Sequence, residues 1–66
     1  MDVVINGERK RVTPGASLLD VLSQLELDPR AVVVEHNRRI VRRPALRDVK
    51  VNEGDAIELV HFVGGG

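Results

Sequence analysis

The sequence predicts an α+β domain in which one mixed sheet of four to five strands carries one main helix packed on one face. Three observations indicate this fold class. Two strand-like segments flank Asn6-Gly7, an apolar stripe of helical period follows Ser17, and further β-branched runs lie at residues 31–35 and 56–62. A hairpin, a helix and later strands in a chain of 66 residues bury their apolar sides most simply as two layers.

The first predicted element is a β-hairpin. Residues 3–5 are β-branched, and residues 8–12 alternate well enough to return beside them as a second strand. Asn6-Gly7 between the two segments is typical of a type I′ turn, because both central positions of that turn require a positive φ.

A short helix is expected after Pro14-Gly15, which breaks the second strand. Ser17 is followed three residues later by Asp20, the arrangement of a capping box that satisfies the free amides of a helix start. Residues 27–29 are expected to end the helix, because Pro29 donates no amide and disfavours helical backbone at the residue before it. The apolar stripe comprises Leu18, Val21, Leu22 and Leu25.

The second half of the chain is predicted to add strands separated by turns. A β-branched run favours a strand at 31–35, and a short strand at 39–41 follows a turn at 36–38. Asn52-Glu53-Gly54-Asp55 is a typical turn sequence, so residues 56–62 form the last strand.

The last strand presents two different faces, because successive side chains of a strand point to opposite sides. Ile57 and Leu59 are assigned to the core, since Glu58 marks the other face as solvated. Val60 and Phe62 then lie on the solvent side, where we expect an apolar patch that binds a partner. The alternative is that a twist or bulge of the strand tucks Phe62 under a loop. The predicted core packs Leu18, Leu22 and Leu25 on Val3, Ile5, Val33, Ile57 and Leu59.

Composition excludes several classes of function. Ten basic and ten acidic residues cancel, so the strong field of a nucleic-acid or membrane-surface binder is missing. Cysteine is absent, which excludes disulfides, thiolate metal sites and a cysteine nucleophile, and favours a reducing compartment. No apolar run approaches the roughly 20 residues of a membrane span. We therefore expect a cytoplasmic protein that is monomeric when free and binds no membrane and no nucleic acid.

Two further features are candidate binding sites. His36 and His61 have no second ligand at metal-binding spacing, so no metal site is expected. The stretch from Arg38 to Lys50 is basic but has no interleaved aromatic residue for base stacking. A solvated face is the favoured interpretation of this stretch, with a steering patch for an acidic partner and nucleic-acid binding as alternatives.

The sequence ends on Gly64-Gly65-Gly66. Three residues without a Cβ can lie in a channel too narrow for side chains, so the α-carboxylate of Gly66 can enter the active site of another protein. We expect residues 1–62 to form the domain and residues 63–66 to form a flexible tail, with Val63 joining the docking patch. The alternative is a frayed terminus without function.

The order of elements followed by a Gly-Gly end resembles the ubiquitin-like sulfur carriers, which have the β-grasp fold. The ending His61-Phe62-Val63-Gly64-Gly65-Gly66 is most similar to the ThiS family of the thiamin pathway. The chain length, the Asn6-Gly7 hairpin, the Ser17 helix start, the strand and turn at 32–37 and the Gly54-Asp55 turn extend this resemblance over the whole chain.

The resemblance implies a protein co-substrate and not an enzyme. In the family, a ThiF-like adenylyltransferase uses ATP and Mg²⁺ to adenylate the terminal carboxylate, here that of Gly66. A sulfur-donating protein then converts the adenylate to a thiocarboxylate, which delivers sulfur to the thiazole synthase ThiG. This chain would itself bind no cofactor. A molybdopterin-type sulfur carrier, a ubiquitin-like protein modifier and a passive β-grasp interaction module remain as alternatives.

Overall fold

The computed structural model describes residues 1–62. The expected tail of Val63 and the three glycines therefore lies outside the described residues, and the boundary between residues 62 and 63 stays a prediction. The elements of the described range are β1 (Asp2–Ile5), β2 (Glu8–Arg11), α1 (Leu18–Gln24), the 3-10 helix η1 (Pro29–Ala31), β3 (Val32–His36), β4 (Arg39–Val41), the 3-10 helix η2 (Arg43–Ala45) and β5 (Ala56–His61).

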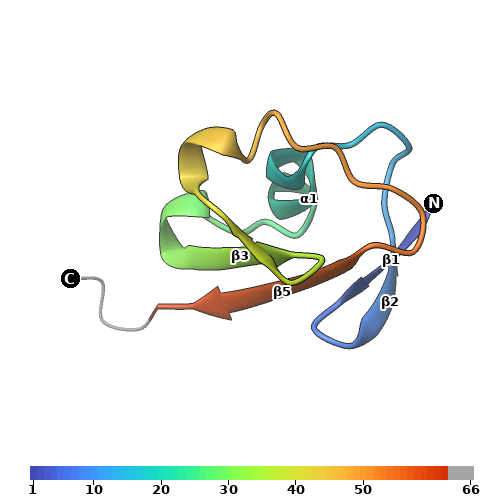
Figure 1. Cartoon of the computed structure of the whole chain (residues 1–66), viewed down its shortest axis with the longest axis horizontal. Helices are drawn as coiled ribbons and strands as arrows, with labels where there is room; N and C mark the ends of the chain where they lie inside the picture. Colours follow the sequence, from blue (N-terminus) through green and yellow to red (C-terminus); the bar gives the residue numbers. More distant parts are fainter. Residues whose placement is uncertain (63–66) are drawn as a thin grey trace.

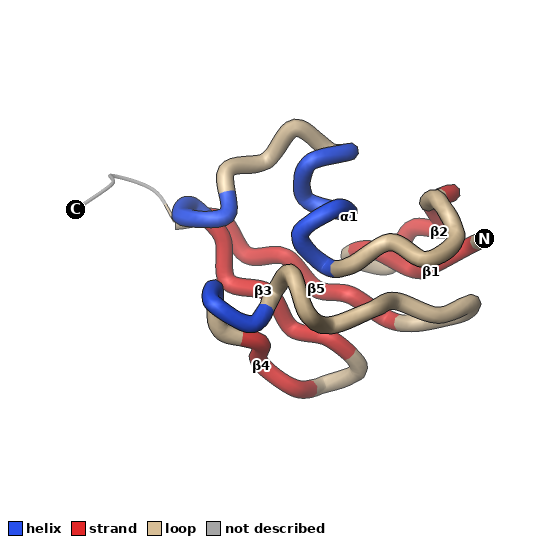
Figure 2. The backbone as a smooth tube through the Cα atoms, turned by 90° about the horizontal axis from the view of Figure 1, so that it is seen from above, coloured by secondary structure: helices blue, strands red, loops and turns tan. Residues whose placement is uncertain are grey.

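The strands form one five-stranded mixed sheet in the order β2-β1-β5-β3-β4. The central strands β1 and β5 are parallel, and the other pairs are antiparallel. Helix α1 and the connection from η2 to β5 lie above β3 and β5 in Figure 1, and Figure 2 shows α1 on one side of the strands. The predicted α+β class, with a four- to five-stranded mixed sheet and one main helix, is confirmed.

The first hairpin has the predicted turn. Asn6 and Gly7 have φ of 50° and 83°, as a type I′ turn requires. The sequence of β2 alternates as expected, but neither face of this strand is buried. Strand β2 lies at the edge of the sheet, and its four residues are all exposed. Val12, expected at the end of that strand, is buried in the loop that follows it.

The capping box at the start of α1 is also confirmed. The Ser17 hydroxyl accepts the amide of Asp20 at 3.1 Å, and the Asp20 carboxylate accepts the amide of Ser17 at 2.9 Å. These hydrogen bonds hold the pKa of the Asp20 carboxyl below its usual value. Ser17 is therefore a buried polar residue that is satisfied by the helix it starts.

The prediction for the end of the helix is wrong by one turn. Helix α1 ends at Gln24, because Glu26 adopts a left-handed φ of 60°. The amide of Leu27 then donates to the Leu22 carbonyl at 2.9 Å and that of Glu26 to the Ser23 carbonyl at 3.0 Å, the two bonds of a Schellman motif. Proline 29 does not stop α1 but begins η1.

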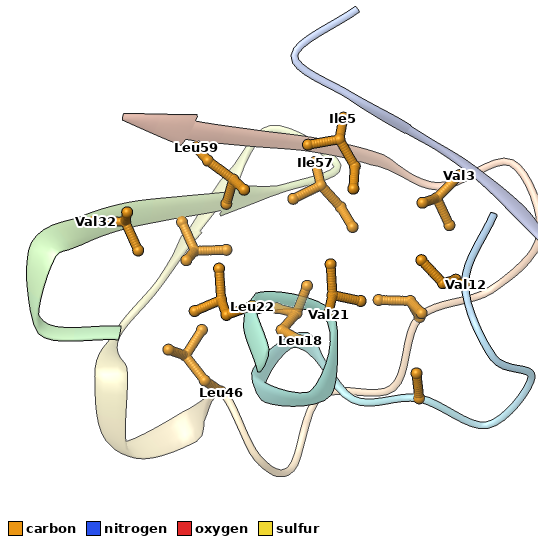
Figure 3. Packing of buried hydrophobic residues seen from close by; sticks show 13 residues of the cluster. Val3, Ile5, Val12, Leu18, Val21, Leu22, Val32, Leu46, Ile57 and Leu59 are labelled. Carbon is orange, nitrogen blue, oxygen red and sulfur yellow. The ribbon is translucent and has the colours of Figure 1, made fainter. Parts of the chain in front are cut away.

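The core lies between α1 and the sheet (Figure 3). One member of the predicted core is wrong. Val33 points away from the helix, because the β3 register buries its neighbours Val32 and Val34 instead. Leu25, the C-cap of α1, is half-buried and packs against the cluster, whereas Val21 of the same stripe is fully buried. The buried cluster is Val3, Ile5, Val12, Ala16, Leu18, Val21, Leu22, Val32, Val34, Leu46, Val51, Ile57 and Leu59.

Candidate functional site

The face of the sheet opposite α1 carries exposed apolar side chains. Ile40 of β4 is 69% exposed, and Val60 and Phe62 at the end of β5 are 60% and 56% exposed. Val33, which is half-buried, lies directly opposite Val60 in the β3–β5 ladder, and Ile40 lies opposite Glu35 in the β3–β4 ladder. We call Val33, Ile40, Val60 and Phe62 the open-face patch.

The predicted exposure of Val60 and Phe62 is confirmed, and the alternative of a Phe62 buried under a loop is wrong. Strand β5 ends at His61, one residue earlier than expected. Phe62 is nevertheless tied to the sheet, because its amide donates to the Ala31 carbonyl at 2.9 Å. The backbone of Phe62 thus stays paired with the end of η1. The other predicted site residues, Val63 and Gly64 to Gly66, lie outside the described range.

A shallow groove adjoins the open-face patch at the Phe62 end. Arg30, Arg42 and Arg43 line this groove together with Phe62, Val33 and Ile40. Arg30 is held by Asp28, whose carboxylate oxygens lie 3.2 Å and 2.9 Å from the guanidinium nitrogens. The apolar patch therefore has a basic border where β5 leaves the sheet.

Two asparagines position β5 from its two sides, whereas the sequence patterns indicate only that both lie in turns. In the first hairpin, Asn6 accepts the Leu59 amide at 2.7 Å and donates to the Leu59 carbonyl at 3.2 Å. In the β3–β4 turn, Asn37 accepts the Ala56 amide through its side chain at 2.9 Å and donates its own amide to the Ala56 carbonyl at 2.8 Å. Each side chain acts as a short piece of neighbouring strand, which holds β5 in register on both sides.

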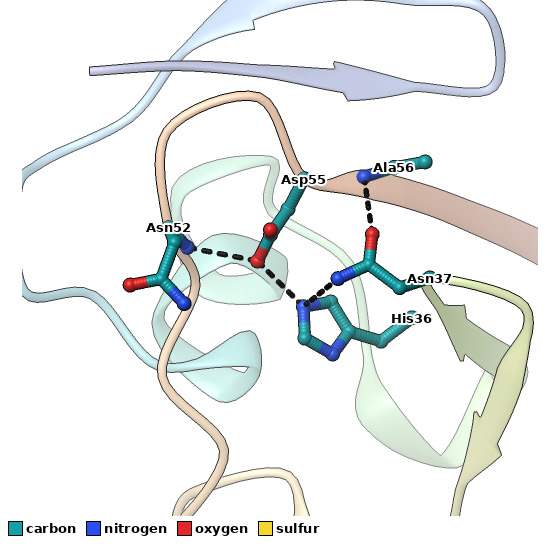
Figure 4. A network of polar contacts seen from close by, with 5 residues as sticks. All are labelled: His36, Asn37, Asn52, Asp55 and Ala56. Carbon is teal, nitrogen blue, oxygen red and sulfur yellow. Dashed lines mark hydrogen bonds and ion pairs between the residues drawn. The ribbon is translucent and has the colours of Figure 1, made fainter.

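A polar pair links the end of β3 to the residue before β5 (Figure 4). His36 Nε2 lies 2.7 Å from Asp55 Oδ2, and both side chains are largely buried. Asp55 also accepts the Asn52 amide at 2.8 Å, which confirms its predicted turn role. Burial raises the pKa of the Asp55 carboxyl, but hydrogen bonds from His36, the Asn52 amide and Asn37 together hold it below its usual value.

The two histidines lie in different surroundings. His36 is paired with Asp55, and His61 is an exposed residue of β5. Residues 1–62 contain no group of three acidic, histidine or cysteine side chains that could hold a metal ion. In that range, no helix has the length and apolar character needed to cross a membrane.

The fold disperses the basic stretch from Arg38 to Lys50. Arg38 belongs to the β3–β4 turn, whereas Arg42 and Arg43 line the groove beside Phe62. Lys50 is paired with Ser17 at the start of α1 and lies close enough to lower the pKa of Asp20 further, after the Ser17 hydrogen bonds. The stretch therefore contributes residues to a turn, to the groove beside Phe62 and to the start of α1.

Comparisons with known proteins all point to one family. The ThiS family matches residues 3–66. The chain is 41% identical over all 66 residues to a thiazole synthase of Paramagnetospirillum magneticum, of which it covers 20%. It is 38% identical over 50 residues to the sulfur carrier protein ThiS of Bacillus subtilis, and the match covers 76% of each chain. A crystal structure of a thiamine biosynthesis protein (ThiS) from Geobacter metallireducens superposes with a TM-score of 0.85, at 32% identity and full coverage of both chains.

Proposed function

The chain belongs to the ThiS family, and from this premise we propose that it carries sulfur for thiamin biosynthesis as a thiocarboxylate on Gly66. The observation that carries the proposal is the family match, which runs through the terminal glycines at residues 64–66. The structure supports it with a second feature. Two members of the open-face patch, Val60 and Phe62, lie at the end of β5, the last strand before those glycines in the sequence, and a partner that takes up the chain end would bind beside them.

The proposed chemistry takes place on the Gly66 carboxylate. One carboxylate oxygen attacks the α-phosphorus of Mg-ATP, and pyrophosphate leaves. Hydrosulfide delivered by a donor protein then displaces AMP, so that a C–S bond forms as the C–O bond to AMP breaks, AMP leaves and the proton of the sulfur passes to solvent. Adenylation is needed because a free carboxylate is a poor electrophile. Since the chain has no cysteine, the terminal carboxyl group is the place where it can carry sulfur covalently.

Three kinds of partner follow from this proposal. A ThiF-like enzyme supplies the nucleotide site, and a sulfur-donating protein supplies the sulfur. A thiazole synthase of the ThiG type consumes the thiocarboxylate. The third is supported by two relatives called thiazole synthase, at 41% and 39% identity, in which the matching segment is 20% of the chain. The chain spans about a fifth of those relatives' length. In this scheme the chain is a co-substrate, and catalysis belongs to its partners.

The proposal is tested by the intact mass of the protein after incubation with ATP, the activating enzyme and a sulfur source. Exchange of one oxygen for one sulfur should add about 16 Da. The same incubation without ATP is the control and should leave the mass unchanged. A native chain that never gains sulfur with a competent enzyme would overturn the proposal. Isopeptide adducts with other proteins would point instead to a protein modifier.

Three variants locate the reactive group. Adding one residue after Gly66, or deleting Gly65 and Gly66, displaces the carboxylate by far more than the reacting distance of about 3 to 3.5 Å allows. Gly65→Val adds a β-branched side chain that a narrow channel excludes. All three variants should keep the fold and lose the mass gain. Thiocarboxylation of the extended variant at the native rate would contradict the role of Gly66.

A further inference from the structure

Along β3 and β5, the open face of the sheet carries charges of opposite sign at its two ends. At one end, Glu35 of β3 lies directly opposite Glu58 of β5. At the other end, Arg42 and Arg43 line the groove that contains Phe62. Within the open-face patch, Ile40 lies beside Glu35, and Val33 and Val60 form the next pair of the β3–β5 ladder toward the groove of Phe62.

The acidic end is unfavourable within the isolated domain. Like charges that face each other across neighbouring strands repel. Glu35 and Glu58 are in register, and no ion pair among residues 1–62 includes either carboxylate. A cation from another molecule placed between them would remove this repulsion.

The basic end carries positive charge that is not neutralised by ion pairs within the described residues. Asp28 faces it and is paired with Arg30, while Arg42 and Arg43 take part in none of the ion pairs of the described residues. The hydrogen bonds from Arg30 are the main reason why the pKa of Asp28 is low, and the nearby positive charge of Arg43 lowers it further. One acid among three arginines leaves this end positive.

We propose that these opposite charges set the direction in which the open face binds a thiazole synthase. The synthase would contribute an apolar surface with a carboxylate side chain facing Arg42 and Arg43 and a cationic side chain facing Glu35 and Glu58. This inference rests on the proposed function. The relatives called thiazole synthase, which contain a segment like this chain, favour the synthase over the activating enzyme as the occupant.

Orientation matters because an apolar patch alone allows more than one docking direction. Strand β5 leaves the sheet beside the basic end, so a reversed domain would carry the chain end away from the synthase active site. Complementary charges suppress the reversed arrangement by placing like charges together. The charges thus add specificity to the contact made by Val60 and Phe62.

Binding of the purified chain to a separately purified thiazole synthase of the same organism tests the basic end. The variant Arg43→Glu should bind several-fold more weakly at low salt, and the difference should shrink at high salt, because exposed charges are screened. Arg47→Glu is the matched control, since Arg47 is exposed, lies beyond η2 and lines neither the patch nor its groove. Equal weakening by the Arg47 variant would mean that only net charge matters and would overturn the proposal.

The acidic end allows a sharper test. Glu35→Lys replaces a repulsive cross-strand pair by an attractive one, so this variant should melt at a higher temperature than the native chain. It should nevertheless bind the synthase several-fold more weakly, with Asp48→Lys, on an exposed loop residue, as the control. Native affinity of Glu35→Lys would overturn the proposal, and so would weakening confined to the activating enzyme. The mass gain at Gly66 is measured separately, so loss of the sulfur-carrier function would be distinguished from loss of this binding mode.

Discussion

The two faces of β5 use apolar side chains in opposite ways. Ile57 and Leu59 are 0% and 7% exposed under α1, whereas Val60 and Phe62 on the other face remain in solvent. Burial of apolar surface stabilises a fold, and exposed apolar surface contributes little to it. A contiguous exposed apolar patch commonly marks an interaction site. The difference indicates that the covered face supplies stability and the open face supplies recognition.

The largest expected effect concerns the covered face. Leu22→Ala removes a fully buried side chain of α1 and should lower the free energy of unfolding by about 2 to 5 kcal/mol, because it leaves a cavity in the core. Val60→Ala on the open face is the control and should cost about 0.5 kcal/mol. Denaturant unfolding measures both. A Leu22 variant as stable as the native chain would remove Leu22 from the core and break the comparison.

The second effect concerns the open face. Phe62→Ala should weaken binding to the activating enzyme or the thiazole synthase by about 1 to 3 kcal/mol and leave folding nearly unchanged. Calorimetric titration and thermal unfolding of the same sample measure the two quantities. His61→Ala, at the neighbouring exposed position whose side chain points to the other face, should bind like the native chain. If the Phe62 variant lost stability and affinity equally, Phe62 would act as a core residue.

The His36–Asp55 pair tests whether polar contacts at the edge of the covered face also serve stability. The pKa of Asp55 is lower in the folded state, so its contribution is complete above the pKa of the unfolded state and is lost as the pH falls through the folded pKa. Asp55→Asn should cost about 1 to 2 kcal/mol at neutral pH. The native and variant stabilities should converge as the pH is lowered below about 4. A difference that stayed constant with pH would assign the effect to packing.

The smallest expected effect is the loss of stability when the same substitution, Ile→Val, is made on each of the two faces. Ile57→Val removes one buried methylene and should lower stability by about 0.5 to 1.5 kcal/mol. Ile40→Val makes the same change at a position that is mostly exposed, and its effect on stability should be close to zero. Equal losses at the two positions, measured by denaturant unfolding, would show that the open face is covered in solution.

Several parts of the fold were predictable because their causes are local. The Asn6-Gly7 turn needs two positive φ angles, and the Ser17 capping box is a contact over three residues. The exposure of Val60 and Phe62 follows from alternation along one strand, once Glu58 marks the solvated face.

The sequence by itself thus determined the turns, the helix start, the faces of the last strand and the resemblance carried by the terminal glycines. Only the tertiary structure decided which face of β3 is buried, because a register shift of one residue exchanges Val33 with its neighbours. It also decided the left-handed Glu26 that ends α1 and the contacts across 19 residues or more that link His36 to Asp55 and Asn6 to Leu59. Such contacts depend on how strands distant in sequence are paired, and no local pattern encodes that pairing.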